Sequence, residues 1–184
     1  MNRTLYCGTF NNAGAIGSMP LPKSYAADTQ RGSNTVQLIN CASRYLLNNR
    51  LKQNGLEPDT TLERLAAQYA ANLPDAAHHV FENWVKQAAP AIAYAIASSV
   101  SIIDFEGVII DGLLPSELTA RLTNAVSAAI NNLDTEGLVL PKLVAGTIGN
   151  DARALGGAFL PFYTNFTPDR SILISGENSV FHDF

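Results

Sequence analysis

Apolar residues recur every three to four positions over much of residues 35–132, which is the spacing of helices that bury one face. This pattern predicts helices over residues 35–53, 61–72, 76–101 and 116–132. The first 33 residues are rich in Asn, Gly and Pro and predict short strands and loops. Apolar runs predict strands at Val108–Asp111 and Lys142–Gly146, and small residues predict a last helix through Leu160.

Polar residues mark where the first helices begin. Ser33 or Asn34 can cap the first helix, and Gly55 can end it. Thr60 and Glu63 have the spacing of a capping box, in which each side chain bonds the other residue's free backbone amide. We therefore expect the second helix to begin just after Thr60.

Asp75 is the expected cap of the third and longest helix. Proline removes one backbone hydrogen bond, so we expect a kink at Pro90. Alanines alternate from 89 to 97 and keep this part of the helix thin, which allows another element to approach closely. Phe81, Trp84 and Tyr94 lie at helical spacing and are expected to pack in the core or at an interface.

The order helix, strand, helix, strand, helix in the second half indicates parallel strands and an α/β layer architecture. In such folds ligands bind beyond the carboxyl ends of strands, where helix N-termini and glycine amides converge. The Asp111-Gly112 turn is therefore the first expected position of a site. Asp104 and Glu106 could act as an acid/base pair, or could simply be solvated in the loop before the strand.

Composition excludes several classes of protein. With 184 residues, 47% of them hydrophobic and 15% charged, the chain can bury a core and is too apolar to be disordered. The net charge is −4 and no basic stripe is present, so we expect no direct binding to DNA or to an acidic membrane. The longest apolar run, 88–100, is too short to cross a bilayer, and we expect a soluble cytoplasmic protein.

The metal-ligating residue types are few and scattered. Cys7 and Cys41 lie far apart and outside any metal-ligand spacing, so we expect two reduced thiols. The histidines, His78, His79 and His182, have no cysteine or carboxylate at a suitable spacing. We therefore expect no metal site and no cofactor.

Three blocks of sequence resemble, in the same order, motifs of the ROK family of sugar kinases and sugar-responsive repressors. Residues 5–20, LYCGTFNNAGAIGSMP, resemble the family's NAGEIGH-M-P motif. Residues 101–112, SIIDFEGVIIDG, resemble its NLLDPEVIVIGGG strand, and residues 151–158, DARALGGA, resemble its A-x-LGAA helix. Three ordered blocks are more specific than one glycine pattern.

The resemblance implies an α/β fold, namely the C-terminal lobe of the actin-like, ribonuclease-H-like ATPase fold with a helical insertion. We expect a single lobe over 1–184, with a motif loop and short strands at 1–33, a helical segment at 34–103, an α/β segment at 104–170 and a tail at 171–184. The family's N-terminal lobe carries a DxGxT phosphate loop and an Asn-Asp pair, and the resemblance begins downstream of both. We expect an excised domain or a truncated gene whose sheet is incomplete at its N-terminal side.

The family's sugar contacts map onto the first block. The resemblance implies ligand positions at Asn12, Gly14, Ala15 and Ser18, although Asn12 and Gly14 are also typical loop formers. Sugar-binding members have glutamate and histidine where this chain has Ala15 and Ser18, and a further glutamate corresponds to Ile39. The CxCGxxGC zinc motif is absent as well. These losses argue against ordinary hexose binding, because each unpaired sugar hydroxyl costs about 1–3 kcal/mol.

The resemblance implies a remnant of the nucleotide site at Asp111, Gly112 and Gly156. Kinases of the family have consecutive glycines at this strand end, whereas this chain continues with Leu113 and then Pro115, which indicates a closed turn. Asp111 could contact a ligand or could serve the turn itself.

The turn and the C-terminal segment resemble the repressor branch more than the kinases. The resemblance implies the effector-sensing and dimerisation domain of a sugar-responsive transcriptional regulator, without catalysis in this chain and without its own DNA-binding part. We expect a homodimer, a small sugar as effector, and DNA binding only through an N-terminal winged helix outside this sequence. The alternative is the C-terminal fragment of an ATP-dependent sugar kinase.

Overall fold

The computed structural model describes residues 8–10, 12–26, 33–69 and 75–166; the side chains of Arg153 and of residues 162–166 are not described. Contacts between Cα atoms divide the chain into two compact units, residues 14–150 and the two ends, 1–13 with 151–184. The first unit holds both sheets and five α-helices, and the described helix of the second unit is α6 (Ala152–Phe166).

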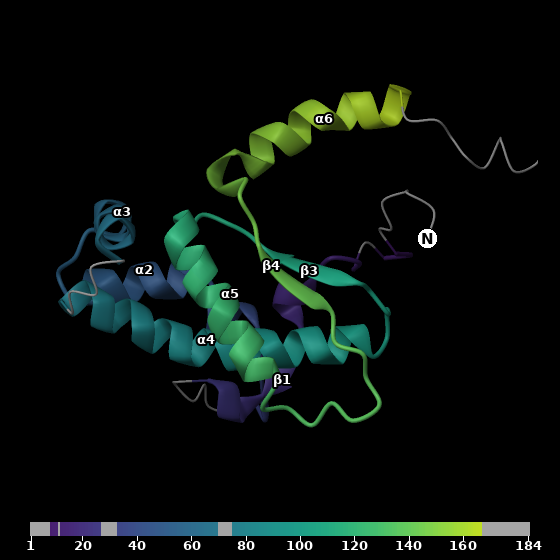
Figure 1. The fold of residues 1–184 in the computed structure, drawn as a ribbon, viewed down its shortest axis with the longest axis horizontal. Helices are drawn as coiled ribbons and strands as arrows, with labels where there is room; N and C mark the ends of the chain where they lie inside the picture. Colours follow the sequence, from purple (N-terminus) through teal and green to yellow (C-terminus); the bar gives the residue numbers. More distant parts are fainter. Residues whose placement is uncertain (1–7, 11, 27–32, 70–74, 167–184) are drawn as a thin grey trace, which may run out of the picture. The chain divides into compact units, whose positions relative to one another are not determined.

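The larger unit combines short strands with helices of very different length (Figure 1). Its elements, in chain order, are η1 (Ile16–Ser18), β1 (Pro20–Pro22), η2 (Lys23–Tyr25), β2 (Thr35–Gln37), α1 (Ile39–Ala42), α2 (Arg44–Gln53), α3 (Pro58–Gln68), α4 (Ala76–Val100), β3 (Gly107–Ile110), α5 (Ser116–Ile130) and β4 (Lys142–Ala145). The short helix η4 (Gly149–Asp151) follows β4. The predicted mixed α/β composition is thus confirmed.

The long helix α4 is the element against which most of the unit packs. Asp75 caps it as predicted, because its Oδ1 accepts a hydrogen bond of 2.8 Å from the backbone amide of His78. The helix is continuous through Pro90. Phe81 and Trp84 are buried, with 0% and 1% exposure, as their spacing predicted. They lie in the main core with leucines from α2, α3 and α5.

The alanines of α4 bring a second group of elements close. Ala91 and Ala95 are fully buried and pack with Leu21 of β1 and Cys41 of α1 in a separate small core. A residue without a side chain beyond Cβ lets a neighbouring backbone lie close to the helix. The predicted close approach is confirmed, and Cys41 is a buried free thiol. Burial raises the pKa of this thiol.

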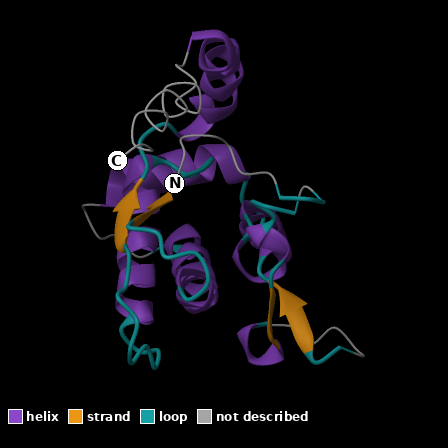
Figure 2. Cartoon of the chain, turned by 90° about the vertical axis from the view of Figure 1, so that its right-hand side faces the viewer, coloured by secondary structure: helices purple, strands orange, loops and turns teal. Residues whose placement is uncertain are grey.

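The two sheets have two strands each and lie apart, with helices between them (Figure 2). β3 and β4 pair in parallel, with Val108 opposite Leu143 and Ile110 opposite Ala145, and α5 connects them. The predicted parallel pairing is confirmed. Val108, Ile110 and Leu143 pack against the main core. Alternate residues point away from it, and Ile109 is 72% exposed.

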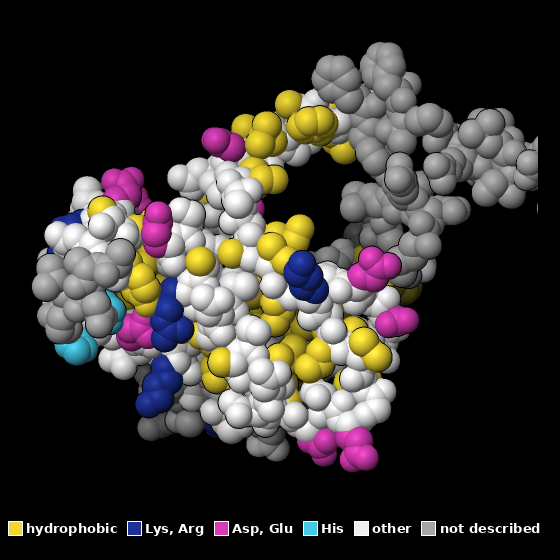
Figure 3. Space-filling view, in the orientation of Figure 1, with side chains coloured by type: hydrophobic (Ala, Val, Ile, Leu, Met, Phe, Trp, Pro, Cys, Tyr) yellow, Lys and Arg dark blue, Asp and Glu magenta, His cyan; other side chains and the backbone are white. Residues whose placement is uncertain are grey.

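The other face of this parallel sheet is apolar and exposed within the described residues. Ile109 and Val144 both lie on it, and Figure 3 shows hydrophobic side chains in the region where Figure 1 draws β3 and β4. Parallel sheets usually have both faces covered.

The prediction of one helix over residues 35–53 is wrong. Residues Thr35–Gln37 form β2, which pairs antiparallel with β1, and α1 and α2 follow as separate helices. Ser43 separates these two helices. Its backbone is extended (ψ 147°), and its side chain caps α2 by accepting from the amide of Leu46 at 3.3 Å. Serine favours such caps over helix interiors because its hydroxyl bonds nearby backbone groups.

The capping box predicted at Thr60 and Glu63 is also wrong. α3 begins at Pro58, and Glu57 occupies the N-cap position without a side-chain bond. Proline suits the first helical position because its φ is already helical and its missing N–H would have no partner there. Thr60 therefore lies inside the helix, where its hydroxyl is 3.5 Å from the carbonyl of Glu57. The predicted end at Asn72 lies outside the described residues.

An ion pair ties α4 to α5 beside the main core. Arg121 donates from Nε and Nη2 to the two carboxylate oxygens of Glu82, at 3.1 and 2.6 Å, and the Tyr69 hydroxyl donates to the same carboxylate. Burial and the bond to Glu82 raise the pKa of Tyr69.

No helix in the described part of the chain has the length and apolar character needed to cross a membrane.

Candidate functional site

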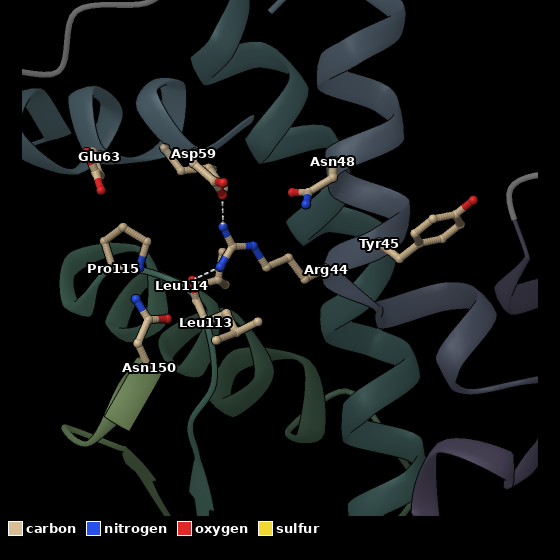
Figure 4. A pocket seen from close by; sticks show the side chains of 10 residues that line it. Arg44, Tyr45, Asn48, Asp59, Glu63, Leu113, Leu114, Pro115 and Asn150 are labelled. Carbon is tan, nitrogen blue, oxygen red and sulfur yellow. Dashed lines mark hydrogen bonds and ion pairs between the residues drawn. The ribbon is translucent and has the colours of Figure 1, made fainter. Parts of the chain in front are cut away.

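A groove of about 680 Å³ opens beside the loop that follows β3. We call it the Arg44 groove, and Figure 4 shows the side chains around it. The first residues of α2 and α3 and the loop before α5 contribute to it: Arg44, Tyr45, Asn48, Asp59, Leu62, Glu63, Leu113, Leu114, Pro115 and Asn150. The groove therefore lies beside the loop that follows the carboxyl end of β3, but Asp111 and Gly112, the residues expected from the sequence to form a site, do not line it.

The Arg44 side chain connects three elements at the groove. Its guanidinium donates to the carbonyl of Leu113, in the loop after β3, and from Nη2 to Oδ1 of Asp59 on α3 at 2.5 Å. Figure 4 shows the guanidinium between these two acceptors, whereas the Tyr45 ring points away. Arg44 thereby links the starts of α2 and α3 to the turn that leads into α5.

Two polar atoms in the lining are buried and have no hydrogen-bond partner. They are Nε of Arg44, a donor, and Oδ1 of Asn48, an acceptor. The residues lie four positions apart on α2, so their side chains share one face of the helix. An unpaired buried polar atom costs about 1–3 kcal/mol. Two residues of the lining thus each keep a buried polar atom, one a donor and one an acceptor, without a partner.

The lining of the Arg44 groove has a net negative charge. Arg44 is its single cation and is already paired with Asp59, and Glu63 adds a second carboxylate. A highly negative group such as a triphosphate would meet repulsion here that Arg44 does not offset. The chemistry of the lining favours a neutral, hydroxyl-rich ligand that also has an apolar face for the leucines and Pro115.

Asp111 organises the turn that follows β3. Its carboxylate accepts backbone hydrogen bonds from Gly112 at 2.7 Å, Ile148 at 3.2 Å and Gly149 at 3.1 Å. Asp111 therefore joins the turn after β3 to the turn after β4. The sequence left open whether Asp111 contacts a ligand or serves the turn itself. These hydrogen bonds are those of a residue that serves the turn.

The other residues predicted from sequence lie elsewhere. Gly14, Ala15 and Ser18 are exposed and form a turn around η1, in which the Ser18 amide donates to the Ala15 carbonyl at 2.9 Å. Gly14 has φ +88°, which explains glycine at this position. Asn12 is exposed and belongs to the smaller unit, as does Gly156 of α6. None of these residues lines the Arg44 groove.

Sequence reasoning missed Arg44, Asn48 and Asp59. Arg44 and Asn48 were placed inside one long helix, so the start of α2 was not recognised. The signal that was available is Ser43, an N-cap residue directly before Arg44. The capping-box spacing places the start of the next helix after Thr60, so it leaves out Asp59, whereas α3 begins at Pro58.

The described residues contain no group of three His, Cys, Asp or Glu side chains that could hold a metal ion. His78 and His79 lie in the first turn of α4, and His78 stacks on Tyr69 with ring centroids 5.8 Å apart.

Comparison with known protein families finds no matching family model, and comparison with curated proteins finds no match.

Proposed function

We propose that this chain is the effector-sensing and dimerisation domain of a ROK-type, sugar-responsive transcriptional regulator and performs no catalysis itself. The three ordered sequence blocks support the family, and the Arg44 groove supports the sensing role. In this proposal DNA is bound by a winged helix outside this sequence, and the homodimer transmits the ligand signal.

The observation that carries the proposal is the pair of unpartnered atoms, Nε of Arg44 and Oδ1 of Asn48. A hydroxyl group both accepts and donates a hydrogen bond, so sugar hydroxyls can supply an acceptor for the Arg44 nitrogen and a donor for the Asn48 oxygen. Carboxylates of Asp59 and Glu63 and the amide of Asn150 offer partners for further hydroxyls. The family's usual sugar position, at Ala15 and Ser18, is not required.

Ligand binding at these atoms would change the hydrogen bonds that Arg44 donates to Leu113 and Asp59. Both atoms are buried, so a ligand reaches them only when the Arg44 guanidinium turns away from Leu113 or Asp59. Releasing that link frees the loop into α5 from the starts of α2 and α3. A ligand shifts a conformational equilibrium by its differential affinity for the two states, and this rearrangement supplies such a difference.

A thermal-shift experiment tests the proposal, since a ligand that binds the folded state raises Tm. The chain is heated with neutral monosaccharides, hexose phosphates and ATP with magnesium. We expect at least one neutral sugar to raise Tm and ATP to have no effect. Asn48→Ala should abolish the sugar shift, whereas Asn132→Ala, the same change at an exposed residue outside the groove, should keep it.

The alternative function, a fragment of a sugar kinase, predicts the opposite ligand. A Tm increase with ATP and magnesium but with no sugar would overturn the effector proposal and support the kinase. No increase with any ligand would overturn a sensing role for the Arg44 groove. An equal sugar shift in Asn48→Ala would place the sugar somewhere else.

A further inference from the structure

A second polar hollow, of about 500 Å³, lies between η2, α2 and α4. We call it the Arg50 hollow; it is lined by Ser24, Tyr25, Ala26, Arg50, Asn83, Lys86, Gln87 and Pro90. Its α4 residues recur at intervals of three and four, so they share one face of that helix. The volume is in the range of small-molecule sites.

Arg50 lies in this hollow without a carboxylate partner. Its Nη2 donates to Oε1 of Gln87, a neutral acceptor, and Gln87 donates to the carbonyl of Tyr25 at 3.4 Å. The ion pairs found among the described residues belong to Arg44, Arg64 and Arg121. The guanidinium is thus held in place by Gln87, and no carboxylate of the described residues pairs with it.

The surroundings of Arg50 are unfavourable to an isolated cation. Burial lowers the pKa of Arg50 from its ordinary value. Lys86 brings a second positive charge to the same lining, which contains no Asp or Glu among the residues that the structure describes. A partly buried cation without a counter-ion has a desolvation cost, so an incoming anion gains more here than at an open surface.

We propose that the Arg50 hollow binds the phosphate group of a small phosphorylated molecule. Two cations match the charge of a phosphate monoester, about −1.5 to −2 at neutral pH. The planar guanidinium of Arg50 can bond two phosphate oxygens, Lys86 adds a point charge, and the Ser24 hydroxyl and Asn83 amide add donors. This site is separate from the Arg44 groove and does not rest on the proposed function.

Titration calorimetry with glucose 6-phosphate, inorganic phosphate and glucose tests the site. We expect one glucose 6-phosphate at this hollow and weaker binding of inorganic phosphate, whereas any glucose binding should be the same in Arg50→Gln as in the unchanged chain. Arg50→Gln should weaken binding about tenfold or more, as expected for a lost charged hydrogen bond, and Lys86→Gln by a smaller factor. Lys52→Gln removes the same charge from the exposed end of α2, outside the hollow, and should change nothing.

Lys86 is exposed, so Lys86→Gln is decisive if Arg50→Gln fails to fold. Equal weakening by Lys52→Gln would overturn the site, because it would show a general charge effect. Absence of phosphate binding, or binding unchanged in both hollow variants, would overturn it too. Equal affinity for glucose 6-phosphate and inorganic phosphate would overturn the assignment to a phosphorylated molecule and leave free phosphate as the ligand. Failure of the neutral-sugar test at Asn48 affects none of these outcomes.

Discussion

Single aspartates determine how two elements of this chain begin or end. Asp75 and Asp111 both accept hydrogen bonds from backbone amides, one at the start of α4 and the other at the turn after β3. Carboxylates suit both positions because the free amides at helix starts and turns point outward as donors. The cap at Asp75 could be inferred from local sequence, whereas two of the partners of Asp111 are 37 and 38 residues away.

Asp75 predicts a pH-dependent contribution to stability. The bond from the His78 amide, and then Arg64 at 2.6 Å, lower the pKa of the Asp75 carboxyl. A lowered folded-state pKa contributes stability that is present above the unfolded value, about 3.9, and is lost as pH falls through the folded value. Asp75→Asn keeps a good N-cap but does not titrate.

We therefore expect the stability difference between the unchanged chain and Asp75→Asn to shrink as pH falls below about 4. Urea unfolding of both proteins at several pH values measures it. Asp75→Ala removes the cap as well and should cost about 1 kcal/mol even at neutral pH. A difference that stays constant across the acid range would contradict the assigned role of the carboxylate.

The close approach of Gly146 to Asp111 predicts that substitutions at these two positions affect stability non-additively. A Cβ at position 146 would overlap Cβ and Cγ of Asp111, so Gly146→Ala must displace the side chain that holds the 148–149 turn. We expect a loss of about 1–3 kcal/mol by thermal or urea unfolding. Gly156→Ala is the control: no heavy atom lies within 4 Å of its Cβ position on α6, and alanine favours helix.

A double-mutant cycle separates this overlap from a general effect of the change. In Asp111→Gly the backbone amides lose their acceptor, and the overlapping Cβ and carboxylate are both gone. Gly146→Ala should therefore cost much less in the Asp111→Gly background than in the unchanged chain. Additive costs would mean that the two residues do not interact.

At the scale of elements, α4 combines two packing modes along its length. Large side chains such as Phe81 and Trp84 fill the main core, and Ala91 and Ala95 meet β1 and α1 in the small core. The alternating alanines from 89 to 97 predicted that another element could approach this part of α4 closely, because the size of each side chain can be read from the sequence. The identity of the approaching elements could not be predicted, since β2 and α1 were read as parts of one helix.

Ala95→Leu tests the close approach. Ala95 has 0% exposure against Leu21 and Cys41, so added atoms force a shift of β1 or α1. We expect destabilisation of about 1–3 kcal/mol, measured by urea unfolding with the fluorescence of Trp84, the single tryptophan. Ala97→Leu, on the same helix but half-buried and outside both cores, should cost less. Equal costs would show that the helix is not constrained at Ala95.

At the scale of the whole molecule, long periodic segments could be predicted from the sequence, whereas contacts between residues far apart in the chain could not. The sequence predicts α4, α5 and the parallel pair β3 and β4, because helical spacing and short apolar runs act locally. The β1–β2 pair depends on contacts between residues about fifteen positions apart, which periodicity does not reveal. The Arg44 groove depends in the same way on Arg44 reaching Asp59 and Leu113, 15 and 69 residues further on.

The proposed homodimer gives the last prediction. The chain has a mass of 19.7 kDa, and we expect light scattering to report twice that mass at micromolar concentration. If the folded state is stabilised by association, mass action makes Tm rise with protein concentration. Both measurements are needed, because aggregation of unfolded chains would raise the mass without raising Tm.

Ligand dependence links this assembly to the proposed sensing role. In the sensing proposal a sugar bound in the Arg44 groove changes the dimer dissociation constant, and by linkage dimerisation then changes the sugar affinity by the same factor. Asn48→Ala should dimerise as the unchanged chain does but no longer respond to the sugar. A monomer at every concentration would contradict the dimerisation role while leaving the groove to be judged by its own ligand test.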